Sequence, residues 1–547
     1  MNDKLMIRTG ALKLIIGVLF LFLFLRVYYL TVVNGDEIRA RAQKQNSLSV
    51  EVADGRSNIY DRHLRAITGV EKTNYAVVFS DGNRTVDFDV CKDLAKYSDE
   101  SEYDIYGRLY KYGKTTVKVN NKIDEELEKN HRTVKILTSN VRYAQDSPAS
   151  SVIGYVSDGE GVMGLEKVYN EQLKAAEDLS VSARSDALRN FIPGGGFEVA
   201  GQTVGSNMLK TTLDLKATRI CQQALDDAGV KGAAVLLDVN SFDVLAMASS
   251  PDFDQNNVAE YLDSPDGNLN NRCLQAYDLG SIFKIVVSAA ALESGAVELD
   301  DKFYCNGYIE VSGKRFDCHK AGGHGEVTFE EAFMYSCNPV FIDIGNKTGY
   351  TNILDMAKRF GVGEKLLHPL EFDQSAGTLP DENNYYMADL ANLSIGQGSL
   401  SSTVLQGCVF SAVIANGGTR KAVNLADSII DNVGQVRENL RVESETQVIA
   451  PEIAQKIFDM MVKTNISGTG TPGNLDEYGG SGGKTGSAET GWYVDGERQQ
   501  HGWYSGFFPV DNPQYALCVL VENGKSGGES AGPIFKEIGE NILKLQE

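Results

Sequence analysis

The longest apolar stretch of the chain lies near the N-terminus, from Leu14 to Val33. It is 20 residues long, and a helix of that length spans the hydrocarbon core of a bilayer. Basic residues precede it at Lys4, Arg8 and Lys13. The pattern predicts a cytoplasmic tail over 1–13, a transmembrane anchor over 14–33 and an extracytoplasmic remainder.

Two points about this stretch stay open. A cleaved signal peptide is the alternative to an anchor, although no small-x-small site stands near Val33. Arg26 interrupts the apolar run. Its side chain either extends to the outer interface beside Tyr28 and Tyr29 or contacts a membrane partner.

The next segment, 34–205, is more polar and alternates in places, and we interpret it as a pedestal or dimerisation-type domain. A polar helix is expected over 36–45, and period-2 alternation indicates strands over 48–52 and 75–79. Glycine-rich stretches at 194–196 and 201–207 indicate a linker.

Apolar segments from 206 to 547 predict a second, compact domain. Strands over 233–239 and 244–249 flank a four-residue turn, which is a hairpin signal. Two further strands are expected over 503–510 and 515–522. Helices are expected over 217–228, 285–292, 329–335, 352–360, 453–462 and 534–545. Strands at both ends with helices between them favour an α+β domain, with one antiparallel sheet covered by helices.

Composition narrows the function classes. The chain has 547 residues, of which 42% are hydrophobic and 23% charged, as in ordinary globular proteins. The formal net charge of −22 argues against nucleic-acid binding and against docking on anionic lipid. Gly194-Gly195-Gly196 lacks a following Lys-Ser or Lys-Thr, so no nucleotide cofactor is implied. No cofactor is expected.

The stretch with the clearest chemistry runs from Tyr277 to Leu292. Gly280 permits a tight entry, and Ser281 then opens an apolar helix that ends at Gly295. Lys284 stands three residues after Ser281, so the two side chains share a helix face. A desolvated lysine can take the proton of a serine hydroxyl, and a helix N-terminus can stabilise an oxyanion.

Alone, this Ser-x-x-Lys pattern is weak, because an N-cap serine and a surface lysine explain it equally well. Ser481 and Lys484 match the same pattern around a Gly-Gly pair that cannot begin a helix. Two later stretches favour the catalytic interpretation: Ser336-Cys337-Asn338 and Lys484-Thr485-Gly486-Ser487. Chance rarely produces all three in this order.

The three elements resemble the active-site signature of class B penicillin-binding proteins, which are bitopic peptidoglycan transpeptidases. The resemblance extends over nearly the whole chain. Further matching segments are Arg56–Arg62, Gly164-Leu165-Glu166 with Tyr169, Leu245–Pro251, His324-Gly325, Ser394–Gly398 and Gly483–Glu489. Ser57 replaces a family glycine, and Ser487 replaces the commoner threonine after Lys-Thr-Gly. At the active site, Leu279 and Ile282 replace the proline and threonine of the family's P-G-S-T-F-K, and neither this change nor Ser487 removes a catalytic group.

The resemblance implies a catalytic set of Ser281, Lys284, Ser336 and Lys484. Ser281 would attack the penultimate D-alanine of a D-Ala-D-Ala stem peptide and form an acyl-enzyme. Lys284 would be the base. Ser336 would relay a proton to the departing D-alanine, with Lys484 tuning that transfer.

The resemblance also implies a substrate-binding set of Asn338, Thr485, Gly486 and Ser487. Asn338 would orient the peptide amide, and Lys484, Thr485 and Ser487 would hold the terminal carboxylate. Backbone N–H groups of Ser281 and Ser487 would form the oxyanion hole. An amine of a second stem peptide would then accept the acyl group.

Partners and location follow from the same resemblance. The implied ligands are peptidoglycan stem peptides and β-lactams, and the implied membrane partner is a polytopic SEDS-type glycosyltransferase. The expected location is the bacterial cell membrane, with a single pass at 14–33 and an extracytoplasmic catalytic domain. Two other function classes stay open: a DD-carboxypeptidase or β-lactamase hydrolase, and a non-catalytic β-lactam-binding scaffold or sensor.

The cysteines have a simpler interpretation. Cys305, Cys318, His319 and His324 resemble zinc ligands superficially, but the long gap between the cysteines lacks Cys-x-x-Cys, so no metal is expected. Outside the membrane, a disulfide between Cys305 and Cys318 is the alternative. Cys337 is interpreted as a buried neighbour of the Ser-x-Asn element.

Overall fold

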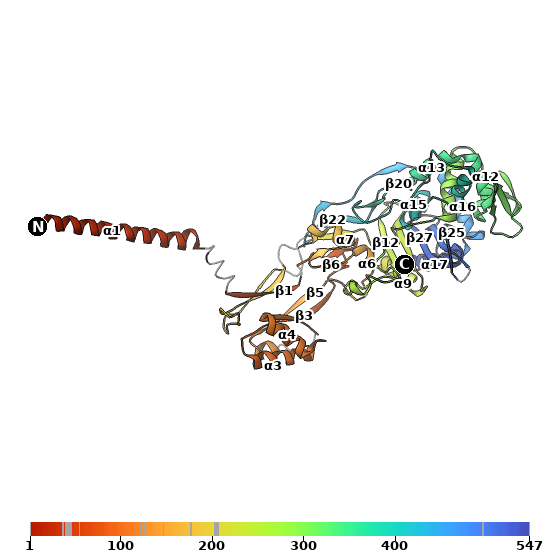
Figure 1. Cartoon of the computed structure of the whole chain (residues 1–547). Helices are drawn as coiled ribbons and strands as arrows, with labels where there is room; N and C mark the ends of the chain where they lie inside the picture. The colour runs from red at the N-terminus through yellow and green to blue at the C-terminus, as the bar shows by residue number, and fades with distance from the viewer. Residues whose placement is uncertain are drawn as a thin grey trace. The chain divides into compact units, whose positions relative to one another are not determined.

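The computed structural model describes residues 2–35, 38, 46–53, 55–120, 122–123, 126–145, 147–174, 178–201, 207–494 and 497–545. The chain forms two compact units that alternate along the sequence (Figure 1). The first contains 1–56, 71–141 and 175–205, and the second contains 57–70, 142–174 and 206–547. The predicted boundary at 205 thus coincides with a change of unit, but contacts also assign 57–70 and 142–174 to the second unit.

The apolar N-terminal stretch is helical. α1 (Asn2–Tyr28) continues into a short π-helical turn, Tyr29–Val33. Residues Met6–Val33 are long and apolar enough to cross a membrane, with a mean hydropathy of 2.3. The Arg26 guanidinium lies 6.0 Å from the ring centroid of Tyr29. The helix expected over 36–45 falls outside the described residues, except for Ile38.

The first unit contains two antiparallel sheets. One has the order β1 (Ser47–Ala53), β8 (Leu179–Arg184), β9 (Phe197–Ala200). The other has the order β4 (Lys114–Val119), β3 (Glu71–Phe79), β5 (Val134–Val141). These strands confirm the predictions at 48–52 and 75–79.

The alternation along β3 places its side chains in two separate cores. Ala76 and Val78 pack with helices α3 (Arg84–Leu94) and α4 (Glu102–Tyr112). Val77 and Phe79 pack instead with residues of β1 and β8. A strand buried on both faces explains why 75–79 is almost continuously apolar.

The second unit is built on a five-stranded antiparallel sheet, which confirms the expected α+β class. Its order is β12 (Val244–Ser250), β11 (Gly232–Asp238), β27 (Tyr515–Gly524), β26 (Glu497–Phe508), β25 (Gly482–Val494). The predicted hairpin is formed by β11 and β12, with Phe242 of its turn at a φ of 59°.

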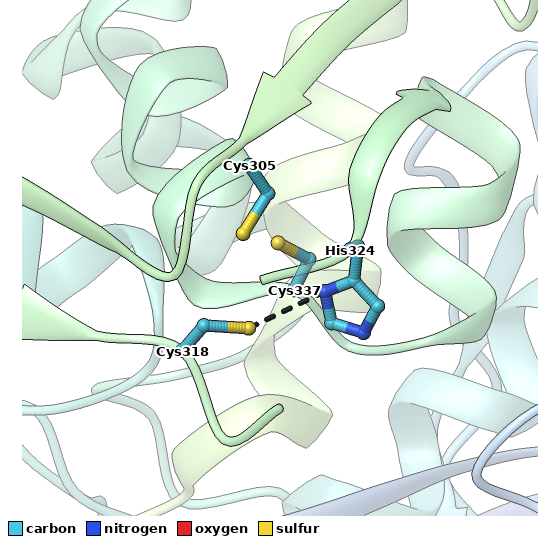
Figure 2. A group of neighbouring side chains, drawn as sticks. All are labelled: Cys305, Cys318, His324 and Cys337. Atoms are coloured by element: carbon cyan, nitrogen blue, oxygen red, sulfur yellow. Dashed lines mark hydrogen bonds between the residues drawn. The ribbon is translucent and has the colours of Figure 1, made fainter. Parts of the chain in front are cut away.

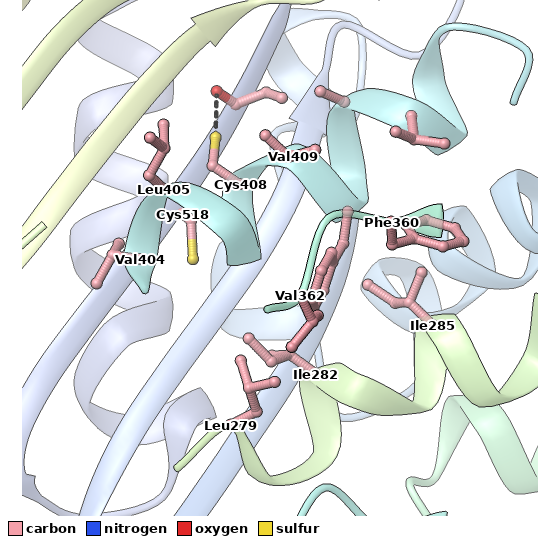
Figure 3. Close-up of a cluster of buried hydrophobic side chains, with 14 of the residues drawn as sticks. Leu279, Ile282, Ile285, Phe360, Val362, Val404, Leu405, Cys408, Val409 and Cys518 are labelled. Atoms are coloured by element: carbon pink, nitrogen blue, oxygen red, sulfur yellow. Dashed lines mark hydrogen bonds between the residues drawn. The ribbon is translucent and has the colours of Figure 1, made fainter. Parts of the chain in front are cut away.

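Helices cover both faces of this sheet. α9 (Leu215–Asp227) and α17 (Gly527–Lys544) pack on one face, where Ala234 and Leu236 of β11 point. The other face packs against α10 (Lys284–Glu293), α15 (Val404–Ala415) and α16 (Pro451–Ser467). Figure 3 shows part of this second core, with Leu279 and Ile282 beside Val362 and with Val404 and Cys408 on α15.

The remaining helix predictions are confirmed in position but not always in length. α11 (Phe329–Met334) and α13 (Tyr350–Arg359) match their predicted ranges closely. α17 begins well before its predicted start, because Ser526 caps it and Pro533 is tolerated inside the helix. α12 (Asn338–Thr348), α14 (Met387–Ser394) and α15 were not predicted. α15 has eleven buried residues among its twelve, so no amphipathic period marks it.

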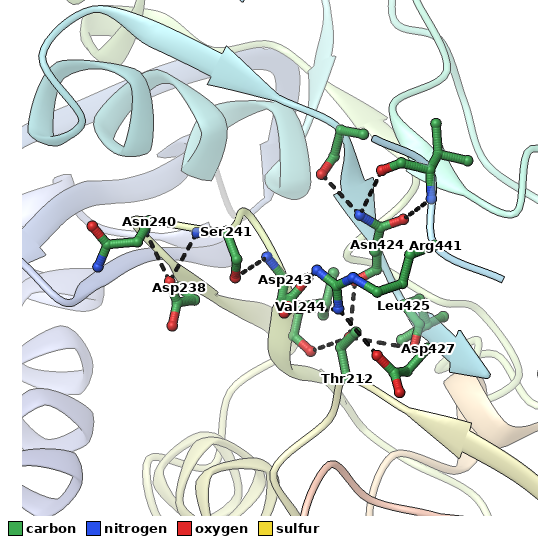
Figure 4. Close-up of polar contacts among 12 residues, drawn as sticks. Thr212, Asp238, Asn240, Ser241, Asp243, Val244, Asn424, Leu425, Asp427 and Arg441 are labelled. Atoms are coloured by element: carbon green, nitrogen blue, oxygen red, sulfur yellow. Dashed lines mark hydrogen bonds and ion pairs between the residues drawn. The ribbon is translucent and has the colours of Figure 1, made fainter. Parts of the chain in front are cut away.

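A smaller sheet completes the second unit, with the order β2 (Ile59–Tyr60), β10 (Met208–Thr211), β22 (Ala426–Ile430), β23 (Val436–Asn439). Polar contacts bind its edge to the β11–β12 turn (Figure 4). Arg441 pairs with Asp243 at 2.6 Å and with Asp427 at 3.3 Å. The buried Thr212 hydroxyl lies 2.8 Å from the carbonyl oxygens of both Val244 and Asn424.

The other described elements are short. In the first unit they are the 3₁₀ turn Ala95–Tyr97 and α5 (Glu126–Asn130). In the second unit the short helices and 3₁₀ turns are α6 (Ser150–Ile153), α7 (Gly164–Val168), α8 (Asn170–Leu173), η3 (Val258–Glu260), η4 (Gly280–Phe283), η5 (Thr471–Gly473) and η6 (Asp476–Tyr478). The short strands there are β6 (Val156–Ser157), β7 (Glu160–Gly161), β13 (Ala276–Tyr277), β14 (Lys302–Cys305), β15 (Tyr308–Val311), β16 (Lys314–Asp317), β17 (Gly325–Thr328), β18 (Leu367–His368), β19 (Ser402–Thr403), β20 (Thr419–Lys421), β21 (Val423–Asn424) and β24 (Glu445–Gln447).

A buried ion pair lies in the part of the second unit that precedes residue 206. The Glu166 carboxylate of α7 is fully buried and accepts a hydrogen bond from Arg142 Nε at 2.7 Å. Tyr143 also donates its hydroxyl to Glu166, at 3.1 Å. Arg142 in turn donates to the carbonyl oxygen of Ser57 at 2.6 Å. Glu166 thereby joins two segments that the sequence separates.

Glu166→Gln is expected to lower the free energy of unfolding of the second unit by about 3 kcal/mol, because Arg142 is left without its anionic partner. Both tryptophans of the chain belong to this unit, so urea unfolding followed by tryptophan fluorescence measures the effect. Glu171→Gln on the neighbouring α8 removes an exposed carboxylate and should leave the transition unchanged. Equal transitions for both variants would contradict a stabilising role for the buried pair.

Candidate active site

The predicted nucleophile lies in a tight turn. Ser281 belongs to the 3₁₀ turn η4, and Lys284 begins α10 immediately after it. The sequence predicted one continuous α-helix here. In a 3₁₀ turn residues i and i+3 eclipse, so Ser281 and Lys284 still share one face. The Ser281 side chain is half-buried, and among the described residues its hydroxyl has no hydrogen-bond partner.

Close backbone contacts fix this turn against β25 and the segment after α14. Gly280 has a φ of 55°, and its N–H donates to the carbonyl of Gly396 at 2.9 Å. A Cβ on Gly280 would lie 2.6 Å from the carbonyl oxygen of Ser487. Trp503 of β26 donates its indole N–H to the carbonyl of Asp278 at 2.9 Å. Ser281 is therefore held beside Ser487, as an oxyanion hole made by their two N–H groups requires.

The Lys284 ammonium is fully buried and faces three oxygen atoms. Its Nζ lies 2.8 Å from the carbonyl oxygen of Ser336, 3.2 Å from Ser336 Oγ and 2.7 Å from Asn338 Oδ1. Burial lowers the pKa of Lys284 to about 7, with a smaller opposing effect from the Cys337 thiol. Both protonation states are then populated near neutral pH, which suits a general base.

The Ser-x-Asn element lies between two helices. A capping box of Thr328 and Glu331 begins α11, and Cys337 is the N-cap of α12. Ser336 has a φ of 53°, a left-handed conformation that is uncommon for a residue with a side chain. Such strain is often found at functional sites. Here it directs both the carbonyl and the hydroxyl of Ser336 toward Lys284.

Lys484 lies on β25 and is also fully buried. Its Nζ donates to the carbonyl of Thr485 at 3.0 Å and lies 5.7 Å from the ring centroid of Phe333. Burial, and secondarily the positive charge of Lys284, lower the pKa of Lys484 well below its usual value. A carboxylate brought to this position would favour the charged form of Lys484.

The remaining predicted residues follow Lys484 along β25. The Thr485 hydroxyl donates to Thr469 Oγ1 at 2.8 Å, and Ser487 Oγ accepts from the backbone N–H of Gly527 at 3.2 Å. A Cβ on Gly486 would lie 3.0 Å from the carbonyl oxygen of Leu279, so a side chain here would press on the nucleophile segment. Thr469 and Gly527 were not predicted, since no sequence motif marks them.

The structure thus brings Lys284, Ser336 and Asn338 into direct contact, and contacts around Gly280 and Gly486 hold the Ser281 turn beside β25. A second group of side chains lies behind Ser336. Cys305, Cys318, His324 and Cys337 have their sulfur and ring-nitrogen atoms within 4.8 Å of one another (Figure 2). His319, which the sequence grouped with these residues, is not a member, and Cys337, which was interpreted only as a buried neighbour, is one. All the cysteines are free thiols, so the Cys305–Cys318 disulfide is not formed in this structure.

Comparison with known families decides the identity. The penicillin binding protein transpeptidase domain matches residues 232–540, more than half of the chain. Stage V sporulation protein D of Bacillus subtilis is 30% identical over 97% of this chain and 84% of its own length. The chain belongs to the class B penicillin-binding proteins.

Other relatives agree with this assignment. Peptidoglycan D,D-transpeptidase PbpA of Mycobacterium tuberculosis is 31% identical, over 57% of this chain and 67% of its own. Among solved structures, penicillin-binding protein 3 of Mycobacterium tuberculosis, complexed with aztreonam, has a TM-score of 0.65 at 22% identity and covers 91% of this chain and 97% of its own. A peptidoglycan synthase complex that couples polymerisation to crosslinking contains a chain with a TM-score of 0.72 at 23% identity, covering 99% of both chains. These two structures share the fold of this class B penicillin-binding protein.

Proposed function

We propose that this class B penicillin-binding protein is a peptidoglycan D,D-transpeptidase that works through an acyl-enzyme on Ser281. The observation that carries the proposal is the buried Lys284 amine, which follows Ser281 by one 3₁₀ turn and contacts Ser336 and Asn338. The names of its relatives support the reaction type.

In the acylation step, neutral Lys284 takes the hydroxyl proton of Ser281, and Ser281 Oγ attacks the carbonyl carbon of the penultimate D-alanine. The backbone N–H groups of Ser281 and Ser487 stabilise the oxyanion. The peptide C–N bond then breaks, and a proton passes through Ser336 to the amine of the departing D-alanine. The 3.2 Å contact between Lys284 Nζ and Ser336 Oγ supports this route.

The terminal carboxylate of the donor peptide is held at β25 by Lys484, Thr485 and Ser487, with Gly486 allowing the strand to approach the nucleophile turn. The contacts of Thr485 with Thr469 and of Ser487 with Gly527 fix both hydroxyls before substrate arrives. Asn338 orients the peptide amide. Such prior positioning lowers the entropic cost of reaching the transition state.

The acyl group then passes to an amine of a second stem peptide, which attacks the Ser281 ester and forms the cross-link. A β-lactam enters the same pathway, because Ser281 opens its strained amide ring and remains acylated. Two of the similar structures are complexes with the β-lactams aztreonam and ampicillin. This supports the same covalent capture here.

The cellular setting is part of the proposal. Residues 14–33, which lie within the apolar helix Met6–Val33, anchor the chain in the bacterial membrane. Residues 1–13 are cytoplasmic, 34–205 serve as a pedestal and 206–547 catalyse outside the membrane. The similarity to a chain of a synthase complex that couples polymerisation to crosslinking supports a SEDS-type glycosyltransferase as the membrane partner.

Ser281→Ala is expected to abolish covalent labelling by a fluorescent penicillin, because alanine has no hydroxyl oxygen that could form the acyl bond. The matched control is Ser288→Ala on α10, whose buried hydroxyl has no hydrogen-bond partner among the described residues. Mass spectrometry of the wild type should locate the adduct on Ser281.

Each other outcome favours a different function. A rapidly released adduct would favour a hydrolase, and no adduct on the folded wild type would favour the scaffold. A long-lived adduct on Ser281 supports the transpeptidase, which a donor and an acceptor stem peptide then test by cross-link formation.

A further inference from the structure

The cluster behind Ser336 consists of groups that bind metal ions. Cys305 and Cys337 are buried, and Cys318 and His324 are half-buried. His324 Nδ1 lies 3.3 Å from Cys318 Sγ, so this nitrogen faces the three sulfur atoms (Figure 2). Three thiols and one imidazole are a known ligand set of structural zinc sites.

The spacing of these atoms suits a tetrahedral ion. A Zn–S bond of about 2.3 Å places the ligand atoms of a tetrahedral site about 3.8 Å from one another. All four ligand atoms of the cluster lie within 4.8 Å of one another. Closure around an ion therefore needs only small side-chain movements. Soft thiolate ligands favour zinc over magnesium or calcium.

Backbone N–H groups surround the sulfur atoms of the cluster. N–H groups of Gly307 and His324 lie within hydrogen-bonding reach of the Cys305 sulfur. The N–H groups of Lys320 and Val340 do the same for Cys318 and Cys337 respectively. Hydrogen bonds from the protein to metal ligands orient them and stabilise their charge.

A second set of contacts fixes the two partly exposed ligands. The His324 ring stacks on Tyr335, with centroids 5.6 Å apart and an interplanar angle of 5°. The Cys318 N–H donates to the carbonyl of Gly307 at 2.8 Å. Cys305 stands opposite Gly325, the residue after His324, in the β14–β17 pair. The cluster is thus assembled before an ion binds, and its half-exposed side offers an entry path.

A disulfide explains this arrangement less completely. Any one disulfide among the three cysteines would leave the third thiol and the imidazole without a role at the same point. Zinc uses all four groups: three thiols release their protons, and the ion with three thiolates and one neutral imidazole carries a net charge of −1.

We propose that Cys305, Cys318, His324 and Cys337 bind one zinc ion, and that this ion holds the Ser336–Asn338 segment in its active conformation. Cys337 stands between the two residues that contact Lys284. Coordination of its sulfur would fix the N-terminus of α12 against β14 and β17. It would also help to hold Ser336 at its φ of 53°, a conformation that is strained for a residue with a side chain.

Metal content tests the site without reference to catalysis. The full chain, purified in detergent without chelators, is expected to contain about one zinc per chain by inductively coupled plasma mass spectrometry. Cys318→Ser should lose the zinc, since a serine hydroxyl is a poor zinc ligand. The matched control is Cys273→Ser, whose buried thiol donates to the carbonyl of Ala248 at 3.1 Å outside the cluster. This control should keep its zinc.

A second measurement needs no variant. Wild-type protein depleted of zinc and loaded with Co²⁺ should show the intense visible absorption of tetrahedral cobalt and a near-ultraviolet thiolate-to-cobalt band.

Three outcomes would overturn the site. The wild type could neither contain zinc nor bind it under reducing conditions, or folded Cys318→Ser could keep undiminished zinc. The third is a native disulfide among the three cysteines in non-reducing peptide mapping.

The role of zinc in positioning Ser336 and Asn338 rests on the proposed function. Its test distinguishes a failure of this role from a failure of the proposed function. Zinc removal should slow penicillin acylation and speed amide hydrogen exchange in residues 335–341, and added zinc should reverse both effects. Exchange that is unchanged by zinc removal would overturn the positioning role. If exchange responds and Ser281 is never labelled in any state, the zinc inference stands and the transpeptidase proposal fails.

Discussion

Lys284→Met is expected to slow acylation of Ser281 by about 10²- to 10⁴-fold, the usual contribution of a positioned general base. Methionine has nearly the shape of lysine and suits a fully buried site, so the substitution removes the amine and leaves the packing close to the native state. The loss should appear in the second-order rate constant for a fluorescent penicillin. A tryptophan fluorescence spectrum of the variant that equals the wild-type spectrum would verify that the variant folds.

Lys347→Met is the control for this experiment, because Lys347 belongs to α12 and its side chain is 47% exposed. It should acylate at the wild-type rate. Lys284→Arg adds a further distinction, since arginine keeps the positive charge and cannot act as a base. If either Lys284 variant acylated within about tenfold of wild type, Lys284 would not be the base.

Gly396→Ala is expected to slow the same reaction by about 100-fold, although Gly396 contacts neither substrate nor Lys284. Its Cβ would lie 2.0 Å from the carbonyl oxygen of Gly280, so the turn that carries Ser281 must move. The backbone N–H of Gly280 also donates to the carbonyl of Gly396, at 2.9 Å, and this contact would be disturbed. A displacement of about 1 Å is enough to cause such a loss.

Gly417→Ala is the matched control, because Gly417 has a similar φ of 62° but no atom within 4 Å of an added Cβ. Both variants place alanine in a left-handed conformation and lose unfolding free energy for that reason, and Gly396→Ala carries the further cost of the displaced turn. Only Gly396→Ala should acylate slowly. Equal acylation rates for the two variants would show that the Gly280–Gly396 contact does not position the nucleophile.

Several strands and helices of the second unit could be predicted from the sequence because their signals are local. β11 and β12 are apolar and separated by five residues, and their pairing is local. α15 was missed because it is buried all around, so its sequence has no polar face that would reveal a period. The Ser281 helix was predicted, but not its 3₁₀ first turn, which depends on contacts with Gly396 and Ser487 far along the chain.

The candidate site was predictable where spacing is a reliable guide. Ser281 and Lys284 are close in the chain, and three motifs in order indicated the other candidate catalytic residues. The thiol–imidazole cluster had no such signal, because the β15–β16 hairpin and the β14–β17 pair return the chain to one point. Cys337 was therefore assigned only to the Ser-x-Asn element, because it lies apart from the other three residues in the sequence.

The alternation of the two units along the chain has a consequence for how the protein is made. Ile59 is fully buried in the core of the second unit, and β2 pairs in parallel with β10. During synthesis residues 57–70 emerge early, and their partner strand β10 emerges about 150 residues later. The first unit needs only the chain up to residue 205 and is free to fold before then. A truncation that begins at residue 206 would lack β2 and the Glu166 pair, and it should aggregate instead of yielding an isolated catalytic domain.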